Sequence, residues 1–341
     1  NAESLYSITG IISELNDVYG SSQISGLNNE DISLTDTSIS STYDVSNLNT
    51  LDGYTSGIVN AGTLTSISGL LSDLITSYQA SGITNLGNEA ITLKDTGTVA
   101  ASHLTTLASL NSTGTINASS VSTITGSATE IIAVYTNGTI NFTAPSSVAL
   151  TVNSGTVSVA QSRTLNANTL GIVTGTITSG TTIAQILDAE TGMTESSGSN
   201  AYTITIDSSD SSVQATQLTS LNLLTTVAVN ASSVTEITGS IEELNIVYAS
   251  GANNEISNLG NENVTITDTS ISDASTLDTL NGYTSGTITA DSVTALTGTA
   301  SVLNTLLTAG NNASVANQFS ANSFASLATA TVSDSTMSLA D

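Results

Sequence analysis

Basic side chains are almost absent from this sequence. Its 341 residues include two of them, Lys94 and Arg163, against 28 Asp and Glu, which gives a formal net charge of −26. Proteins that bind nucleic acid hold phosphate chiefly with Lys and Arg, and an anionic membrane surface repels an acidic chain. We therefore expect no nucleic acid among its partners.

Cysteine and tryptophan are missing, proline occurs once, and aromatic residues make up 4% of the chain. Without cysteine there is no disulfide framework. No apolar run approaches the roughly 20 residues of a membrane-spanning helix, so we expect no membrane insertion. Strong acidity suits a salty exterior, where counterions screen the self-repulsion of the chain, and predicts an extracellular, cell-surface location.

Small polar residues and single aliphatic ones fill most of the chain. Hydrophobic residues amount to 38% and charged residues to 9%, and the aliphatic side chains recur at regular intervals. A disordered chain typically combines high charge with few apolar residues. The pattern instead predicts an ordered fold with a thin core, as in repeat proteins whose units cover only their neighbours.

Internal repetition is the strongest pattern in the sequence. NAESLYSITGIISELNDVY, which begins at Asn1, matches NASSVTEITGSIEELNIVY, which begins at Asn230, at 12 of 19 positions. NLNTLDGYTSG from Asn47 matches TLDTLNGYTSG from Thr276 at 8 of 11 positions. Self-similarity at a fixed period indicates a repeat architecture.

Two motifs measure the period of this repeat. Spacings of 59, 57, 113 and 59 separate the last residues of an [I/L]-[T/S]-G element: Gly10, Gly69, Gly126, Gly239 and Gly298. Spacings of 59, 58, 54 and 61 separate the last residues of a strand-like element: Asp36, Asp95, Asn153, Asp207 and Asp268. Both indicate a repeat period of about 58 residues. We therefore predict a repeat array over 1–298 with about five to six copies, degenerate at 137–200, and a divergent terminal segment or junction over 299–341.

Each period contains two similar half-units, such as GTVAASHLTTLAS from Gly97 and GTINASSVSTITG from Gly114. The pattern of each half-unit predicts a short strand followed by a short helix. A Ser or Asp is the predicted N-cap of that helix, and it precedes an apolar i, i+3 pair. A further helix is predicted in SIEELNIVY, SATEIIAVY and TASVLNTLL. The fold class predicted is mainly β: an elongated parallel β-solenoid of ~58-residue repeats with short helical corners. The alternative is a string of small β-sandwich modules.

The apolar pairs of the half-units are predicted to form the core, because they recur in one phase along the array. Ten such positions are Leu104, Leu107, Val121, Ile124, Val234, Ile237, Leu277, Leu280, Val293 and Leu296.

The phrases LNTLDGYTSG, GTINASSVSTITG and ISNLGNENVTITDTSIS resemble the repeats of giant cell-surface proteins of marine cyanobacteria, the SwmB-type motility-associated surface proteins. The resemblance covers most of residues 1–298 and weakens between about 137 and 200. It implies secretion, surface display and a much longer parent chain, and it carries over no catalytic residues.

The residues that most catalysts need are scarce. His103 is the only histidine, and the repeat places it in a polar, variable column that includes Ser120 and Ser292, so we expect it on the surface. Strand alternation sends Lys94 outward, and Arg163 lies more than one period away. A polysaccharide-cleaving site needs a cation or metal beside a base. We predict no enzyme and no catalytic or cofactor-binding residues.

Acidic residues form the only recurrent candidate site. Pairs six residues apart occur in the same phase of three copies, and stacked repeats are expected to align them into ladders: Glu30 and Asp36, Glu89 and Asp95, and Glu262 and Asp268. Calcium prefers such oxygen ligands, so these are candidates for weak Ca²⁺ binding. The favoured interpretation is that each Asp closes its strand by bonding its own turn backbone.

The predicted function is a structural repeat segment of an extracellular cell-surface filament, coat or stalk. Residues 1–20 show no distinct polar cap, so we expect assembly end to end with copies of itself or further repeats of a longer parent chain. The alternative is an adhesin-like binding module for glycan or calcium on the solenoid face. Tyr54 and Tyr283 occupy equivalent positions and are predicted to be structural corners rather than sugar-binding rings.

Overall fold

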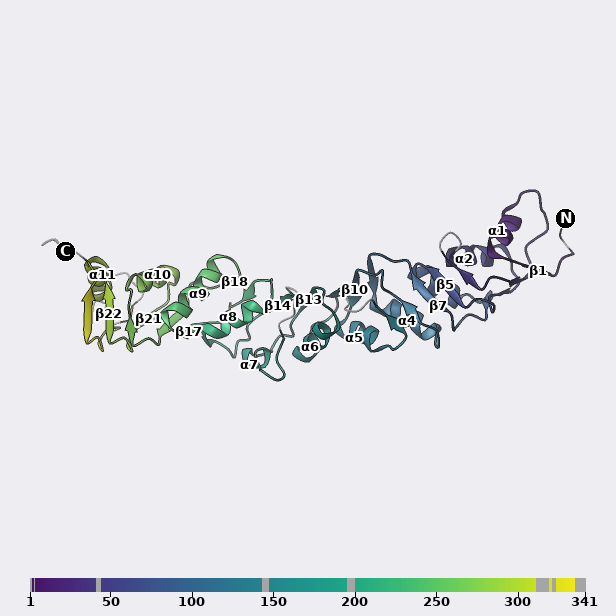
Figure 1. Ribbon diagram of the computed structural model, residues 1–341. Coiled ribbons are helices and arrows are strands. Elements are labelled where there is room, and N and C mark those ends of the chain that lie inside the picture. The colour runs from purple at the N-terminus through teal and green to yellow at the C-terminus, as the bar shows by residue number, and fades with distance from the viewer. Residues whose placement is uncertain are drawn as a thin grey trace. The chain divides into compact units, whose positions relative to one another are not determined.

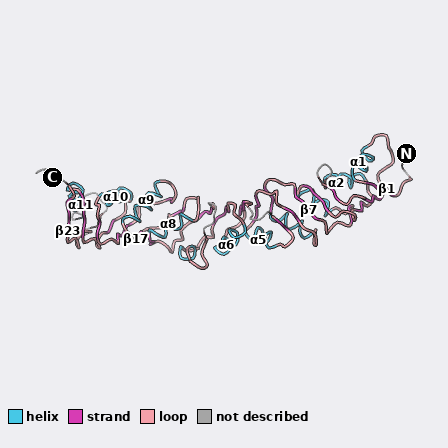
Figure 2. The backbone as a smooth tube through the Cα atoms, viewed as in Figure 1, coloured by secondary structure: helices cyan, strands magenta, loops and turns pink. Residues whose placement is uncertain are grey.

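Short strands and helices alternate along the chain, which divides into two units. The computed structural model describes residues 2, 4–40, 44–142, 147–194, 200–310, 319–320 and 323–334 (Figures 1 and 2). The first unit comprises Asn1–Thr156 with Thr164–Thr174, and the second comprises Val157–Arg163 with Gly175–Asp341.

Five helices and twelve strands lie wholly in the described part of the first unit. The helices are α1 (Ile12–Gly20), α2 (Val45–Tyr54), α3 (Leu71–Gln79), α4 (Ala101–Leu110) and α5 (Ala128–Thr136). The strands are β1 (Ser7–Gly10), β2 (Asp31–Leu34), β3 (Ser38–Ile39), β4 (Val59–Asn60), β5 (Ser66–Gly69), β6 (Ile83–Thr84), β7 (Ala90–Leu93), β8 (Thr98–Ala100), β9 (Ile116–Asn117), β10 (Thr123–Gly126), β11 (Ile140–Asn141) and β12 (Ala149–Val152). Helix α6 (Val159–Asn168) and strand β13 (Val173–Thr176) include residues of both units.

The second unit continues the same alternation. Its helices are α7 (Ile183–Ile186), α8 (Ala215–Leu223), α9 (Ile241–Ala252), α10 (Ser275–Tyr283) and α11 (Ala300–Gly310). Its strands are β14 (Ala201–Thr203), β15 (Ser212–Gln214), β16 (Val229–Asn230), β17 (Glu236–Gly239), β18 (Ile256–Ser257), β19 (Asn263–Ile266), β20 (Ser270–Ile271), β21 (Ile288–Thr289), β22 (Ala295–Gly298) and β23 (Thr329–Val332).

Every register observed between the described strands is parallel. Sheets with orders β1-β2-β4-β6 and β11-β9-β7-β5-β3 lie in the first unit, and β15-β17-β19-β21 and β20-β22-β23 in the second. Ser7 pairs with Asp31 and Val59 with Ile83, so at these points the chain leaves a sheet and returns to it beside the strand that it left. We call each such return a coil. Parallel pairing does not fit the alternative of β-sandwich modules, which are built from antiparallel sheets.

Helix outweighs strand in this fold. Among the described residues, about 32% are helix and about 25% are strand, so the mainly β prediction is not supported and the architecture is mixed. The reason is local: many strands are two to four residues long, as β4 and β7 are, whereas α2 has ten residues.

The core consists of aliphatic side chains in the predicted phase. All ten predicted core positions are buried, with between 0% and 4% of each residue exposed, which confirms the prediction. The helices predicted in SATEIIAVY and SIEELNIVY form α5 and α9, and Ser127 and Ser240 cap them through capping boxes. In these boxes, the N-cap hydroxyl and the third helical residue's carboxylate each satisfy a backbone N–H.

The two half-units differ in structure, although their sequences are similar. Leu104 and Leu107 lie in helix α4, as predicted, but Ile124 lies in strand β10, so the helix predicted for the second half-unit is wrong. The side-chain oxygen of Asn117 accepts the N–H of Ser119 at 3.0 Å. Such a local turn competes with helix formation.

The predicted terminal segment continues the pattern in its described part. Strand β23 pairs with β22, and the buried rings of Phe319 and Phe324 lie 5.4 Å apart. Residues 311–318, 321–322 and 335–341 of this segment lie outside the described residues.

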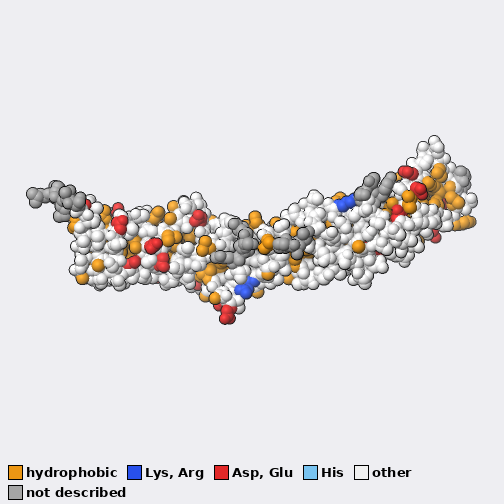
Figure 3. Space-filling model, viewed as in Figure 1, with side chains coloured by type: hydrophobic (Ala, Val, Ile, Leu, Met, Phe, Trp, Pro, Cys, Tyr) orange, Lys and Arg blue, Asp and Glu red, His pale blue; other side chains and the backbone are white. Residues whose placement is uncertain are grey.

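One face of the molecule shows few charged side chains. On the face shown in Figure 3, uncharged polar side chains and backbone predominate, and the acidic side chains are scattered. Among the described helices, none combines the length and the apolar character needed to cross a membrane.

Candidate functional site

The scarce basic residues serve local contacts. His103 is exposed, as the repeat predicts. The Nζ of Lys94 lies 2.7 Å from the carboxylate of Asp44, which precedes α2. The side chain of Lys94 is 33% exposed. Arg163 donates from Nη1 to the carbonyl of Gly192 at 3.0 Å. The structure therefore brings none of these three residues into a shared site.

The three glutamates of the predicted pairs are fully buried. Glu30, Glu89 and Glu262 are each 0% exposed. A tyrosine hydroxyl from the preceding helix donates to each Oε2: the donors are Tyr19 at 3.2 Å, Tyr78 at 2.5 Å and Tyr248 at 3.2 Å. Sequence reasoning missed this burial because Glu is almost never fully buried unless it is paired.

The loop before each glutamate folds back over its carboxylate. In the copy with Glu89, the N–H groups of Gly87 and Asn88 donate to Oε2 at 2.9 and 3.1 Å. Asn85 starts this loop with a φ of 65°, a left-handed conformation that asparagine tolerates better than most residues. The equivalent Asn258 also has a φ of 65°, so the loop is a repeated element.

The GYTSG motif closes the other side of the glutamate. Thr284 donates from Oγ1 to the carbonyl of Glu262 at 2.7 Å, and Gly286 donates its N–H to that hydroxyl oxygen at 2.9 Å. A Cβ on Gly286 would overlap the Glu262 carbonyl oxygen, so only glycine fits there. Thr55 makes the same bond to Glu30 at 2.7 Å.

Paired tyrosine rings cover two of the three sites. Tyr54 stacks on Tyr19 with ring centroids 5.9 Å apart, and Tyr283 stacks on Tyr248 at 5.8 Å. This arrangement is consistent with the structural corner predicted for Tyr54 and Tyr283. Burial, and then the charge of Glu30, raise the pKa of Tyr19 to about 12.

Burial also raises the pKa of Tyr78 and of Tyr248 well above the usual range of a phenol, and the neighbouring glutamates add to the effect. These hydroxyls therefore keep their protons and remain donors. Because each carboxylate is closed off from solvent, it cannot reach a substrate, and the Tyr–Glu corner is structural.

One oxygen of each of these three carboxylates is buried without a hydrogen-bond donor among the described residues. Within the part of the chain that the structure describes, the buried Oε1 atoms of Glu30, Glu89 and Glu262 accept no hydrogen bond. In the copy between those of Glu89 and Glu262 that contains β12, Val148 takes this position, and Thr169 still donates to the Val148 carbonyl at 2.6 Å. The corner therefore exists in an acidic and an apolar form.

The aspartates of the predicted pairs cap helices of the preceding coil. Their Oδ2 atoms accept the first helical N–H groups: Asp36 from Ile12 at 2.8 Å, Asp95 from Leu71 at 2.8 Å and Asp268 from Ile241 at 2.6 Å. The prediction that each bonds its own turn is therefore wrong for these three. An acidic group at a helix N-terminus is favourable, because it satisfies an orphan N–H and opposes the helix dipole.

Two further residues do the same and were not predicted. Asp210 accepts from Ile183 at 2.7 Å and Asp334 from Ala300 at 2.6 Å. In the sequence, each of these Asp residues follows the first residue of the helix that it caps by 24 to 34 positions. Asp207, in contrast, does bond its own turn, since its Oδ1 accepts the N–H of Ser209 at 3.0 Å.

The candidate calcium pairs do not form shared sites. Glu30 and Asp36 lie at opposite ends of β2, and six residues of extended chain span roughly 20 Å. The expected ladder of glutamates is also wrong, because β2 and β7 belong to different sheets. Among the described residues, no three His, Asp or Glu side chains gather as a metal ion would require.

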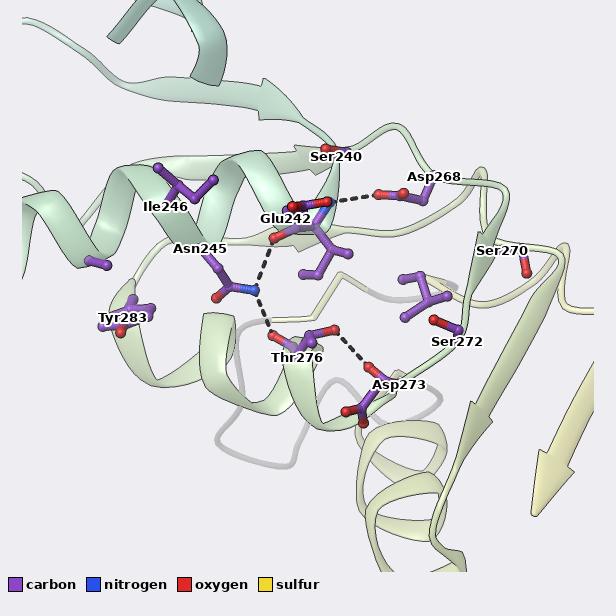
Figure 4. A pocket seen from close by; sticks show the side chains of 13 residues that line it. Ser240, Glu242, Asn245, Ile246, Asp268, Ser270, Ser272, Asp273, Thr276 and Tyr283 are labelled. Atoms are coloured by element: carbon purple, nitrogen blue, oxygen red, sulfur yellow. Dashed lines mark hydrogen bonds between the residues drawn. The ribbon is translucent and has the colours of Figure 1, made fainter. Parts of the chain in front are cut away.

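A groove in the second unit lies between the start of α9 and the loop that leads into α10 (Figure 4). Its volume is about 690 Å³. The lining residues are Ser240, Ile241, Glu242, Asn245, Ile246, Ala249, Asp268, Ser270, Ile271, Ser272, Asp273, Thr276 and Tyr283.

The comparisons with known proteins identify no relative: no family model, no curated protein and no solved structure matches the chain.

Proposed function

We propose that this chain is a structural repeat segment of an extracellular cell-surface filament, coat or stalk. The observation that carries the proposal is that each coil is completed by its neighbour. Asp95 lies in the coil after α3 and caps that helix. Thr55 lies in the coil after Glu30 and donates to the Glu30 carbonyl, which closes that corner. Such nearest-neighbour completion suits a protein that bears load along an array and has no catalytic role.

The finer architecture that we propose is a parallel β-solenoid with short helical corners in each unit. It is supported by the parallel registers at intervals of about one coil, and by helices that contact the next helix in sequence, as α2 and α3 do. The resemblance to cyanobacterial surface repeats remains a hypothesis beside it.

The partners that we propose are copies of this chain or further repeats. Strand β1 is an edge strand, and β23 is another whose four residues are all exposed. Exposed strand edges favour pairing with another chain. The net charge of −26 is proposed to keep filaments from fusing sideways in a salty exterior.

Small-angle X-ray scattering of the purified chain tests the architecture. A compact protein of this length has a radius of gyration of about 20 Å, and a solenoid is expected to exceed it clearly. A radius no larger than that of a compact protein would contradict the solenoid. Cleavage of a polysaccharide by the pure protein would contradict the structural role.

Sedimentation velocity over a range of protein concentrations tests the assembly. End-to-end pairing predicts oligomers whose frictional ratio rises with mass. Tyr6, 88% exposed beside β1, offers a variant, because Tyr6→Lys places a charge at the strand edge and is expected to weaken association. A monodisperse monomer at every concentration would rule out assembly by copies of this chain.

A further inference from the structure

We propose that Asn137 is a site of self-modification: the turn that it forms with Thr139 promotes the loss of ammonia from its side chain, which yields aspartate and isoaspartate without an enzyme. The reaction needs only water and hydroxide. It is separate from the proposed structural role and does not depend on how the chain assembles. The argument combines an activated side-chain carbonyl, a backbone nitrogen beside it, and equivalent turns in which that nitrogen is bonded.

The side-chain carbonyl of Asn137 accepts two hydrogen bonds. Asn137 follows the last residue of α5, and its Oδ1 accepts the backbone N–H of Thr139 at 2.9 Å and the hydroxyl of the same residue at 2.7 Å. Thr139 is held in turn by the neighbouring coil, because its carbonyl accepts the N–H of Ile116 at 2.8 Å. Two donors fixed on one carbonyl oxygen stabilise the negative charge that develops there when a nucleophile attacks the carbon.

The nearest nucleophile along the chain is the backbone nitrogen of Gly138. The bond between Asn137 and Thr139 folds the side chain back over the intervening peptide, so the closed ring includes this nitrogen. Among the described residues, the N–H of Gly138 donates no hydrogen bond. Gly138 is exposed, and nothing lies within 4 Å of the place that a Cβ would take. Hydroxide from the solvent can therefore reach the proton on this nitrogen.

The same turn recurs at three other asparagines, and there the following nitrogen is bonded. Each of them accepts the N–H of the second residue after it at 3.0 to 3.1 Å: Asn60, Asn117 and Asn230. Each is followed by a fully buried alanine whose N–H donates to a carbonyl of the next coil at 2.8 to 3.0 Å: Ala61, Ala118 and Ala231. Asn137 therefore differs from them in having an exposed glycine with an uncommitted N–H.

The reaction consumes one water and releases one ammonia. Hydroxide removes the proton from the nitrogen of Gly138, and this nitrogen forms a bond to the Cγ of Asn137. The Cγ–Nδ2 bond then breaks, and ammonia leaves after it takes up a proton from water. Water opens the resulting succinimide at either of its carbonyls. Cleavage of the new Cγ–N bond gives aspartate, and cleavage of the original backbone C–N bond gives isoaspartate.

Both products change the end of helix α5. Each places a carboxylate directly after Thr136, the last residue of the helix, where the negative end of the helix dipole lies. Isoaspartate also routes the main chain through the side chain, which lengthens it by one methylene. The modification therefore weakens this end of the helix.

Peptide mass spectrometry of the full chain, aged in mildly alkaline buffer, tests the proposal. We expect both products to accumulate at Asn137 at least about tenfold faster than at Asn281, because Asn281 also precedes a glycine but lies in α10, where main-chain N–H groups bond within the helix. Asn117, which forms the same turn before Ala118, is expected to stay intact. Equal rates at Asn137 and Asn281 would overturn the proposal.

Two variants of Thr139 separate the effect of the turn from that of the glycine. Thr139→Val removes the hydroxyl donor and keeps the branched shape, and we expect it to slow the reaction by about tenfold, because one of the two donors on the oxygen is lost. Thr139→Ser keeps a hydroxyl and should react like the parent chain. A faster or unchanged reaction in Thr139→Val would show that the turn does not promote the reaction.

The same chain unfolded in guanidinium chloride supplies the reference rate. The turn is lost there, so the parent chain and Thr139→Val are expected to react alike. The folded parent chain should react at least as fast as the unfolded one, and a slower reaction would mean that the fold protects Asn137, which contradicts the proposal. Thermal melting shows whether each variant folds. If Thr139→Val does not fold, the comparison of the folded and unfolded parent chain decides.

Discussion

The hydroxyl of Tyr78 donates a 2.5 Å hydrogen bond to the carboxylate of Glu89, and both groups lie inside the coil. The same pair recurs as Tyr19 with Glu30 and as Tyr248 with Glu262. A buried carboxylate needs partners, and the loop and the tyrosine together supply them. These three corners are therefore organised around one acidic side chain each rather than around a larger apolar cluster.

Removal of the tyrosine hydroxyl should destabilise this corner. We expect Tyr78→Phe to lower the free energy of unfolding by about 1 to 3 kcal/mol, because the carboxylate loses a buried donor. Glu89→Val copies the apolar form of the corner, in which Val148 takes the place of the glutamate. In that background the Tyr78→Phe change is expected to cost much less. Chemical denaturation of the four proteins measures the coupling, and additive effects would contradict it.

Loss of a capping aspartate should matter most where the helix has no cap of its own. The residue before α3, Leu70, offers no side-chain acceptor, so Asp95 is its described cap. Asp95→Ala is expected to cost about 0.5 to 2 kcal/mol. Asp268→Ala is the control, because Ser240 still caps α9. An equal loss in both variants would show that the cap from Ser240 does not replace the cross-coil bond, which would contradict this prediction.

Two glycines of one motif should respond in opposite ways to alanine. Gly286→Ala brings a Cβ into overlap with the Glu262 carbonyl oxygen, so the chain must shift and unfolding should become easier. Gly282 lies in α10 with nothing within 4 Å of the added atom. Gly282→Ala is expected to stabilise the chain by about 0.5 to 1 kcal/mol, since alanine favours helix. Similar melting temperatures for both variants would contradict the corner geometry.

Core and surface leucines provide a test of the repeat phase. Leu107 is 0% exposed and Leu223 is 67% exposed. Leu107→Ala should cost about 2 to 5 kcal/mol, because it removes buried surface and leaves a cavity. Leu223→Ala should change the stability little. Comparable losses for both would mean that the core is placed wrongly.

Periodicity in the sequence was enough to place the core and several helices. Leu104 and Leu277 recur in one phase, and a side chain that faces its neighbours in every coil must be apolar. The difference between the half-units was not predictable in this way. Ile124 has the same spacing as Leu107, but the turn at Asn117 decides that it enters a strand.

The candidate site was harder to predict because its partners come from other parts of the chain. The acidic pairs were visible, yet a six-residue spacing says nothing of what faces each carboxylate. Tyr19 and Tyr78 each precede their glutamate by 11 residues, and that spacing was the available signal. Asp36 caps α1 because the register between neighbouring coils brings the two together. That register cannot be predicted from the sequence of one repeat.

Alkaline pH should unfold the chain through its buried tyrosines. Burial raises the pKa of Tyr19 from 10.0 to about 12, and raises those of Tyr78, Tyr202 and Tyr248 further. Below pH 10 both the folded and the unfolded states keep these protons, so the stability is fully present. Above pH 10 the unfolded chain loses its protons first, and stability falls until the folded phenols also titrate.

The composition makes this alkaline profile easy to interpret. The sequence has one lysine, so few other side chains titrate in the same range. Melting temperatures measured from pH 8 upward are expected to fall above about pH 10, the ordinary pKa of a phenol. A variant with Tyr19, Tyr78 and Tyr248 all changed to Phe should start less stable and fall less steeply. A flat profile in the parent chain, or an unchanged slope in the triple variant, would show that these phenols are not buried in the folded protein.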